Sequence, residues 1–382
     1  MRPPLLLHIF PSFNVGGAQV RFAKLANHFG SRWRHAVVAL DGQTECLERI
    51  DADVDITLIP APPVKDRHLA QRLADIRKIL VRLKPDLLVT SNWGSIEWAI
   101  AKLLIPSLPH LHTEDGFGPE ESTRQIPRRV LTRQIALRWS TIVLPSQALL
   151  KAALSEWRLS GQKVHYIANG LDLGLFNRNG QKETVWPDRS IPHIGTVAAL
   201  RPEKNLARLL RAAALMRTNG HEFRLTILGD GPERQTLEST CEGLGLTEVV
   251  RFTGHRTDPA AYYRGFDIFA LSSDTEQMPF SVLEAMASGL PIASTNAGDI
   301  RHMVARENAP YIVPGSDSDL AEALASLVSD RCLRLSIGQA NRDRAVSAYD
   351  QGRMLTQYAE LIDRTRQASL RPYHSNWKKG AA

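Results

Sequence analysis

Cysteine is scarce in this sequence. Cys46, Cys241 and Cys332 stand far from one another along the 382 residues. Isolated cysteines suggest neither a disulfide framework nor a metal-binding pair. We therefore expect three buried free thiols and a fold without disulfide crosslinks.

Long hydrophobic runs are also missing. The apolar run in the opening segment, MRPPLLLHIF, covers six residues, which is too short for the core of a signal peptide. No later segment reaches the roughly 18 apolar residues that a membrane-spanning helix requires. These absences predict a cytoplasmic protein.

Nucleic-acid recognition motifs and basic patches interleaved with aromatic residues are absent, although the net charge is +7. The positive charge is concentrated in one half of the chain. Residues 1–188 hold 24 Lys and Arg against 18 Asp and Glu, a balance of +6, and the remaining residues hold 23 against 22, a balance of +1. We expect no nucleic-acid partner.

The most concentrated positive charge lies in residues 122–139, STRQIPRRVLTRQIALRW. Five arginines occur there without an acidic residue and are interleaved with apolar side chains, which predicts a basic amphipathic helix: Arg124, Arg128, Arg129, Arg133 and Arg138. Such a helix could lie against anionic lipid headgroups at the inner membrane face. It could equally be a packed surface helix with a solvated charged face.

The length of the chain favours two domains, because single hydrophobic cores stop growing at roughly 250–300 residues. Short apolar runs alternate with helix-period segments from the start of the chain, and this rhythm predicts parallel sheets covered on both faces. The polar, turn-rich stretch 177–192 is the best candidate for a linker. We therefore predict an α/β protein with two doubly wound, Rossmann-like domains at 1–176 and 193–345, followed by a helix and a frayed basic tail within 346–382.

The stretch SSDTEQMPFSVLEAMASGLP, residues 272–291, follows a predicted strand and leads into a predicted helix. Ser281 and Glu284 have the spacing of a capping box, which would make them helix punctuation. A helix that begins after a strand is also an anion site, because its free amides and its dipole attract phosphate. The acidic turn before the helix, which contains Glu276, favours a ligand-binding site over helix capping alone.

This stretch resembles the signature of family 4 glycosyltransferases, which keep two glutamates separated by seven residues before a helix. Other segments match the family in the same order along most of the chain: NVGGAQ, LPS, IANGLDLGLF, RPEKN, LGDGPER and FTGH. The resemblance implies the GT-B fold, with two Rossmann-like lobes facing a cleft. It also implies a nucleotide-sugar donor on the second lobe and a saccharide or lipid-linked saccharide acceptor on the first.

The resemblance implies roles for residues of the second lobe. Glu276 would contact sugar hydroxyls, Glu284 the ribose hydroxyls, and Lys204 the diphosphate as its charge grows. Other expected donor-binding residues surround the phosphates and the sugar: Met278, Pro279, Phe280, Ser281, Gly229, Gly231 and His255. No tight Asp-x-Asp pair is placed to chelate magnesium, and the family generally needs no metal, so we expect neither a metal site nor a cofactor.

One position departs from the family pattern. Many relatives carry an arginine five residues before the lysine, where this sequence has Ala199. In relatives this arginine would contact the phosphates of the donor. Arg201 is expected to make that contact instead, because a guanidinium can bind phosphate in a bidentate manner. The alternative is an ordinary surface arginine.

In the first lobe the resemblance places Gly16, Gly17 and His112 at the cleft, together with Asn169 from the following segment. Paired glycines let a backbone approach a ligand closely, but they also form tight turns. His110 and Asp115 compete with His112 for the same place in the family pattern. A lone histidine at a strand end is often a hydrogen-bonded structural residue.

The resemblance implies transfer with retention of configuration at the anomeric carbon. A covalent sugar intermediate would need a carboxylate nucleophile below the ring, and none is assigned here. Attack on the same face, with the departing phosphate oxygen helping to take the acceptor proton, is the hypothesis. A sugar-nucleotide epimerase and a non-catalytic binder of sugar nucleotides share the fold and remain alternatives.

Overall fold

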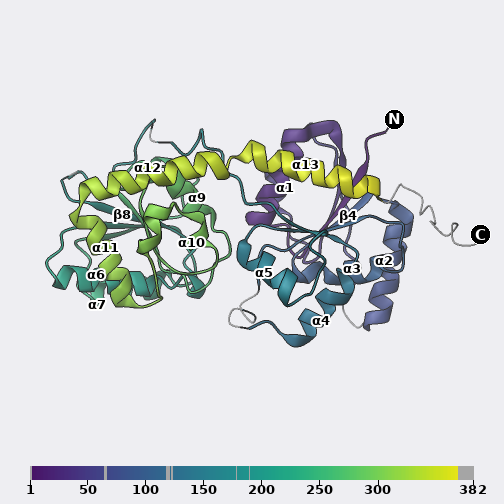
Figure 1. Cartoon of the computed structure of the whole chain (residues 1–382), viewed down its shortest axis with the longest axis horizontal. Coiled ribbons are helices and arrows are strands. Elements are labelled where there is room, and N and C mark those ends of the chain that lie inside the picture. Colours follow the sequence, from purple (N-terminus) through teal and green to yellow (C-terminus); the bar gives the residue numbers. More distant parts are fainter. Residues whose placement is uncertain are drawn as a thin grey trace, which may run out of the picture. The chain divides into compact units, whose positions relative to one another are not determined.

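The computed structural model describes residues 2–63, 67–117, 121, 124–177, 179–188 and 190–368, and the expected tail beyond residue 368 lies outside them. The chain forms two compact units, each with its own sheet and its own helices (Figure 1). The first comprises Met1–Pro145, Leu149–Ile167 and Leu355–Ala382, and the second comprises Ser146–Ala148 and Ala168–Met354.

The sheet of the first unit is parallel throughout. Its strands, in sheet order, are β3 (Ile56–Leu58), β2 (Arg34–Ala39), β1 (Leu5–Phe10), β4 (Leu87–Ser91), β5 (His110–Thr113), β6 (Thr141–Leu144) and β7 (Val164–Tyr166). The helices around it are α1 (Gly17–Phe29), α2 (Leu69–Leu83), α3 (Ile96–Lys102), α4 (Pro127–Ala136), α5 (Gln147–Ser155) and α13 (Gln351–Ala368).

Strand β1 shows how the two faces of this sheet are covered. Successive side chains of a strand point to opposite faces. Leu7 and Ile9 belong to a buried cluster that includes residues of α2 and α3, whereas Phe10 belongs to a cluster with residues of α1. The His8 ring lies 4.5 Å from the ring of Phe22 in α1, so the sheet has helices on both faces.

Helix α13 supplies part of the second face although it comes last in the chain. The Arg21 guanidinium lies over the Tyr358 ring, 5.5 Å from its centroid, and Arg32 donates to Asp363 at 2.6 Å. Burial and the charge of Asp115 raise the pKa of Tyr358 to about 12, against the opposite effect of Arg21. The C-terminal helix therefore packs on α1 and belongs to the first unit.

Helix α4 is shorter than the basic helix predicted over residues 122–139, and Ser122 and Thr123 lie outside the described residues. Arg133 is fully buried and Arg129 is half-buried, and both contact Glu121. Three of the five arginines remain exposed, namely Arg124, Arg128 and Arg138. Two of the five arginines of the predicted basic amphipathic helix thus turn inward to a buried carboxylate just upstream.

The sheet of the second unit is also parallel. Its strands, in sheet order, are β10 (Val250–Gly254), β9 (Arg224–Leu228), β8 (His193–Val197), β11 (Ile268–Leu271), β12 (Ile292–Thr295) and β13 (Ile312–Val313). The helices around it are α6 (Leu206–Thr218), α7 (Arg234–Gly243), α8 (Ala260–Tyr263), α9 (Phe280–Ala287), α10 (Ile300–Met303), α11 (Asp317–Ser329) and α12 (Arg331–Ala348).

The two faces of the second sheet carry separate apolar clusters. Helices α6, α7 and α11 pack on one face, around Ile194 and Ile227. Helices α8 and α9 pack on the other face, around Phe269 and Leu271. Two parallel sheets, each covered on both faces, confirm the predicted α/β fold class.

The polar stretch 177–192, predicted as a linker, packs on the second unit. Trp186 is 7% exposed, and its indole N–H donates to Thr226 Oγ1 at 3.1 Å. The guanidinium of Arg251 lies 3.9 Å from the centroid of the Trp186 ring. A buried tryptophan thus ties this irregular segment to the second sheet, which its polar composition did not indicate.

The expectation of buried thiols holds for two of the three cysteines. Cys46 and Cys241 are buried and free, whereas Cys332 is exposed. The prediction was wrong for Cys332, which follows the first residue of α12 at the surface.

Buried neutral histidines make the first unit sensitive to acid. Burial lowers the pKa of His35 from 6.5 to about 4, and burial together with His35 lowers the pKa of His8 well below its usual value. Between about pH 6.5 and pH 4, His35 binds a proton in the unfolded chain but not in the folded protein. The free energy of unfolding therefore falls as the pH drops below about 6.5. At pH 5 we expect His35 alone to lower the free energy of unfolding by about 2 kcal/mol.

Denaturant unfolding at pH 7 and pH 5 measures this loss. The double variant His8→Gln, His35→Gln should show a smaller loss, because neither amide titrates. The control His255→Gln, which alters an exposed ring, should retain the loss of the unaltered protein. An equal loss in the double variant and the control would contradict the assignment.

Candidate active site

Lys204 and Glu276 meet at the carboxyl edge of the second sheet. Lys204 follows β8, Glu276 follows β11, and these strands are neighbours in the sheet. Lys204 Nζ donates to Glu276 Oε1 at 2.6 Å, and the Ser273 hydroxyl donates to the same oxygen at 2.7 Å. The structure therefore brings together the two residues expected to contact the sugar and the diphosphate.

The pair keeps free capacity for a ligand. An ammonium has three donors and a carboxylate has about four acceptor sites, and the mutual contact uses one of each. The Lys204 side chain is 24% exposed and that of Glu276 is 7% exposed. A partly buried cation beside a partly buried anion can therefore receive an anionic group and hydroxyl groups at adjacent positions.

The loop that carries Glu276 is fixed by close backbone packing. Gly298 has φ +56°, and a Cβ atom there would lie 2.3 Å from the Glu276 carbonyl oxygen. The Thr295 hydroxyl donates to the Ser273 carbonyl at 2.6 Å. Only glycine fits at position 298, because any side chain would displace the loop.

Helix α9 begins at Phe280, and no side chain caps its N-terminus. Its N-cap is Pro279, so Ser281 lies inside the first turn and the capping box suggested by Ser281 and Glu284 does not form. The backbone amides of the first turn of a helix lack acceptors within the helix. Within the described residues the Val282 amide donates to the Pro279 carbonyl at 3.2 Å, so the amides of Phe280 and Ser281 are the ones that remain available for an anion.

Glu284 is held by a residue that the sequence reasoning missed. The Tyr263 hydroxyl donates to Glu284 Oε2 at 2.8 Å, and the Ser281 carbonyl oxygen lies 3.1 Å from the same hydroxyl. Burial, together with the charge and hydrogen bond of Glu284, raises the pKa of Tyr263 well above its usual value. Tyr263 therefore remains a neutral donor that orients this carboxylate. Tyr263 lies in the segment AAYYRG, residues 260–265, and no spacing in the sequence linked this tyrosine to Glu284.

Met278 is buried, and Pro279 is half-buried at the start of α9. The Asn169 side-chain amide donates to the Met278 carbonyl at 3.2 Å. Asn169 is 5% exposed. Its amide therefore supports the backbone of the 276–280 loop, and its expected place at the cleft stays a prediction.

Gly229 and Gly231 follow β9 and are packed against the segment that follows β8. A Cβ atom at Gly229 would lie 1.9 Å from the Ala198 carbonyl oxygen, and one at Gly231 would lie 2.5 Å from that of Leu200. Chain packing therefore accounts for both glycines. A donor contact by their backbone stays a prediction.

Two further predicted residues occupy exposed positions at the same edge of the second sheet. Arg201 is exposed and directly precedes the short 3-10 helix Pro202–Lys204. His255 is exposed and follows the last residue of β10. Their roles stay predictions.

In the first unit, Gly16 lies between β1 and α1, and Gly17 is the first residue of α1. Gly16 is the N-cap of α1 and has an extended backbone with φ −154°, which other residues also adopt. The preceding Asn14 has a buried Oδ1 without a hydrogen-bond partner among the described residues. The sequence reasoning missed this amide, which stands two residues before Gly16.

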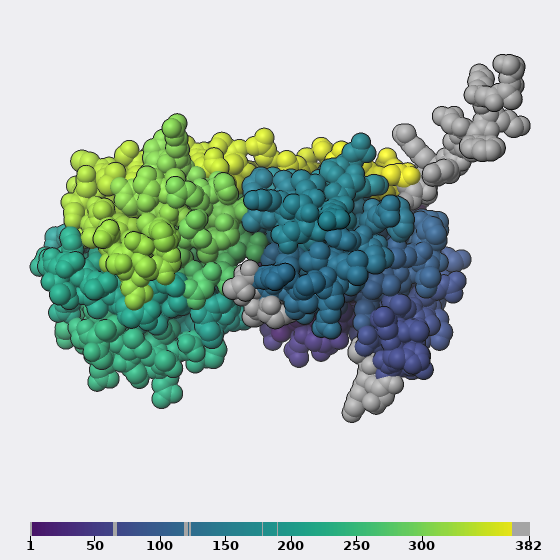
Figure 2. All heavy atoms as spheres, turned by 60° about the horizontal axis from the view of Figure 1, so that its bottom comes forward, coloured from purple at the N-terminus to yellow at the C-terminus, as the bar shows by residue number. Residues whose placement is uncertain are grey.

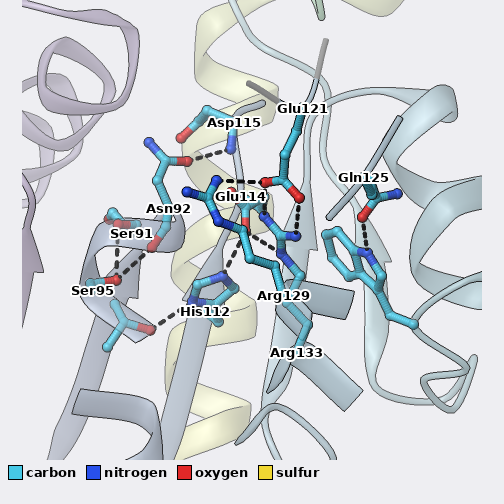
Figure 3. A network of polar contacts seen from close by, with 12 residues as sticks. Ser91, Asn92, Ser95, His112, Glu114, Asp115, Glu121, Gln125, Arg129 and Arg133 are labelled. Carbon is cyan, nitrogen blue, oxygen red and sulfur yellow. Dashed lines mark hydrogen bonds and ion pairs between the residues drawn. The ribbon is translucent and has the colours of Figure 1, made fainter. Parts of the chain in front are cut away.

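His112 is fully buried in β5. Its Nδ1 lies 2.7 Å from Thr90 Oγ1, and its Nε2 lies 3.3 Å from Glu114 Oε2 (Figure 3). Both ring nitrogens are therefore occupied by protein groups, which is the arrangement of a structural histidine. His110 is buried as well, whereas Asp115 is partly exposed and pairs with Arg21 at 2.6 Å. Of the three competing residues, Asp115 is the one with an accessible side chain.

A buried charge network continues from His112 (Figure 3). Arg133 contacts Glu121 through both terminal nitrogens at 3.3 Å, and Arg129 adds a third contact at 3.0 Å. Burial opposes ionisation of Glu121, but hydrogen bonds from Arg133, Ile126 and Arg129 lower its pKa overall. Arg133 also lies 3.5 Å from Glu114, which directly follows β5, so the network ties α4 to the end of this strand.

The described residues contain no group of three or more His, Cys, Asp or Glu side chains that could hold a metal ion. Among them, no helix is both long and apolar enough to cross a membrane.

Replacing Gly298 with alanine tests the packing of the 276–280 loop. The strained backbone should cost about 1–2 kcal/mol, and the contact with the Glu276 carbonyl should add about 1–3 kcal/mol. The matched control is Gly245→Ala, because Gly245 has φ +67° but open space around its Cα. Thermal unfolding should show the larger loss for Gly298→Ala, and equal losses would contradict the packing argument.

Sequence profiles of two families match this chain. The family described as "Glycosyltransferase Family 4" matches residues 15–175, and the family described as "Glycosyl transferases group 1" matches residues 187–344. The two matches together cover most of the chain and fall on the first and second sheets in turn.

Two curated relatives illustrate the sequence similarity. The sulfoquinovosyl transferase SQD2 of Arabidopsis thaliana is 26% identical over 290 residues, which are 69% of this chain and 54% of that protein. A GDP-mannose-dependent alpha-mannosyltransferase of Mycobacterium tuberculosis is 31% identical over 194 residues, 49% of this chain and 48% of the relative. The matched region thus spans about half the length of these relatives.

Solved structures show the same fold. HepE of Anabaena, determined in complex with UDP, has a TM-score of 0.76 at 19% identity, covering 95% of this chain and 100% of that one. A glycosyltransferase from Rickettsia africae has a TM-score of 0.77 at 15% identity, covering 97% and 100%. The profile matches and the fold show that the chain belongs to glycosyltransferase family 4 and has the GT-B fold.

Proposed function

We propose that this chain transfers a sugar from a nucleotide-sugar donor to a saccharide or a lipid-linked saccharide. The observation that carries the proposal is the Lys204–Glu276 pair at 2.6 Å, beside the uncapped start of α9. A cation and free helix amides suit a diphosphate, and a carboxylate suits hydroxyl groups. The family relatives named above, which transfer sugars, support the same reading.

The donor would be distributed over the carboxyl edge of the second sheet. Glu284, oriented by Tyr263, would accept hydrogen bonds from the ribose hydroxyls. The backbone of Met278 to Ser281 would surround the phosphates and the sugar, except that Pro279 has no N–H to donate. The exposed Arg201 would add a second cation for the diphosphate, in place of the arginine that many relatives have where this chain has Ala199.

The reaction would retain the anomeric configuration. Glu276 is engaged by Lys204 and Ser273, so it is better suited to hold hydroxyl groups than to attack the anomeric carbon. The acceptor oxygen would attack on the face from which the diphosphate departs, and a departing phosphate oxygen would take the acceptor proton. Lys204 would stabilise the negative charge that grows on the diphosphate as the glycosidic bond breaks. No metal or other cofactor is part of this proposal.

The acceptor and the cellular site belong to the same proposal. A saccharide or lipid-linked acceptor would place the enzyme in the synthesis of a cell-surface polysaccharide or glycolipid, in the cytoplasm and at the inner membrane face. Leu131 and Ile135 are 56% and 55% exposed on α4. Together with the exposed Arg124, Arg128 and Arg138 they give this helix a surface suited to anionic lipid. In Figure 2 the part of the chain that contains α4 is coloured blue-teal.

Variants of the ion pair test the transferase proposal. Lys204→Met should lower kcat about 10²–10³-fold, because a fixed charge at the leaving group is lost, and Glu276→Gln should also lower transfer. A thermal-shift panel of nucleotide sugars identifies the donor, because a ligand that binds the folded state raises the melting temperature. The control is Lys182→Met, which removes an exposed lysine of the same unit. Unchanged transfer in both pair variants would remove the proposal.

The products separate the remaining alternatives. The anomeric configuration of the product should equal that of the donor, and an inverted product would remove the retaining mechanism alone. Conversion of the donor without an acceptor would indicate an epimerase. Donor binding without transfer to any acceptor would indicate a binding protein.

Membrane docking through α4 has its own test. The double variant Leu131→Ser, Ile135→Ser should bind vesicles of phosphatidylcholine and phosphatidylglycerol about tenfold more weakly, because two apolar side chains no longer enter the interface. Binding by the unaltered protein should weaken as salt is added. The control Val81→Ser, Leu154→Ser removes two exposed apolar side chains from other helices. Equal binding of both double variants would remove α4 as the docking surface.

A further inference from the structure

A pocket of about 400 Å³ opens at the amino-terminal edge of the first sheet. It lies where β5 and β6 begin, at His110 and Thr141, and next to Lys163, which directly precedes β7. The residues at the carboxyl ends of the strands, including Gly16 after β1, lie at the opposite edge. The pocket is therefore separate from the candidate active site of this unit.

Two lysines supply the charge of this pocket. Lys102 is the last residue of α3 and is 7% exposed, and Lys163 is exposed. Neither forms an ion pair in the part of the chain that the structure describes, and no described lining residue is acidic. Burial, followed by the charge of Lys163, lowers the pKa of Lys102. A buried cation beside a second cation is costly when no anion is near, and a bound anion would offset that cost.

The other polar groups of the pocket do not compete with the lysines. His110 has both ring nitrogens occupied, by Thr90 Oγ1 at 2.8 Å and Ser140 Oγ at 2.7 Å. Burial, with His112 and Lys102, lowers the pKa of His110 well below its usual value, so this ring is neutral. Thr365 Oγ1 of α13 donates to Thr141 Oγ1 at 3.2 Å, which leaves the Thr141 hydroxyl proton for a ligand acceptor.

The rest of the lining is apolar and ends in an exposed tryptophan. The apolar lining residues are Leu103, Pro106, Leu108, Pro109, Trp139 and Ala368. Trp139 is 61% exposed and follows Leu131 and Ile135 at intervals of four residues. Because α4 leads from the carboxyl edge of β5 to the amino edge of β6, this exposed apolar stripe runs toward the pocket. Tryptophan is enriched where membrane meets water.

We propose that this pocket binds the phosphate of an anionic phospholipid headgroup, with Lys102 and Lys163 as its cations and Trp139 at the boundary with the acyl chains. The combination of a buried lysine beside an exposed one, an apolar wall and an exposed tryptophan fits an amphiphile better than a free phosphate ion. The proposal goes beyond the transferase function and does not depend on it. It assigns a defined headgroup site, whereas α4 alone provides a general surface.

The test compares two double variants in vesicle sedimentation. Lys102→Met with Lys163→Met keeps the length of both side chains and removes both charges. Lys151→Met with Lys182→Met removes two exposed charges outside the pocket. On vesicles of phosphatidylcholine with phosphatidylglycerol, the pocket variant should bind about 25-fold more weakly, roughly fivefold for each lysine. The control should stay within about twofold of the unaltered protein.

Three results would overturn the proposal. The first is equal vesicle binding by the pocket variant and the control. The second is the absence of binding by the unaltered protein. The third is stabilisation by inorganic phosphate or glycerol phosphate that only the pocket variant loses, with vesicle binding unchanged, which would assign the pocket to a soluble phosphate compound.

Two further measurements separate this site from folding and from transfer. Thermal unfolding of the pocket variant should match or exceed that of the unaltered protein, because two cations without an anionic partner have been removed. Transfer to a soluble acceptor should be unchanged in the pocket variant. A loss of transfer there would place the lysines in the transferase machinery and contradict a separate site.

Discussion

The contact between Lys204 and Glu276 is the interaction on which the second unit's candidate site depends. Two neighbouring parallel strands, β8 and β11, end at the same edge and deliver a cation and an anion to one point. Each charge stabilises the other in a partly buried place where either alone would be costly. The surrounding features, from the Ser273 hydroxyl to the close approach of Gly298, keep that point in one geometry.

Much of this was predictable from the sequence, because strand and helix periods and the collinear motifs are local properties. They indicated two parallel α/β units, the strand–loop–helix around Glu276, and the convergence of Lys204 and Glu276 from separate strands. Ser281 and Glu284 have the spacing of a capping box, but the box does not form, because α9 begins two residues too early for Ser281 to be its N-cap. Spacing alone cannot reveal where a helix starts within one turn.

The misses have a common physical cause. Tyr263, the partner of Glu284, comes from a different helix, and Glu121, the partner of Arg129 and Arg133, lies in the loop before α4. Contacts between segments leave no periodicity in the sequence. For the same reason, the spacing in 122–139 predicted a basic amphipathic helix but did not show that two of its arginines pair with a buried carboxylate. The lysines of the proposed headgroup pocket likewise come from two other segments.

The chain enters the second unit at Ser146–Ala148 and again after Ile167, and it returns to the first unit after Met354, so neither unit is a continuous fragment of the sequence. A protein cut after Ile167 would lack Tyr358, and Arg21 would lose the ring it lies over. Fragments or chimeras that exchange only the first half would therefore expose the face that α13 covers. Recombination between relatives should carry the last helix together with the first sheet.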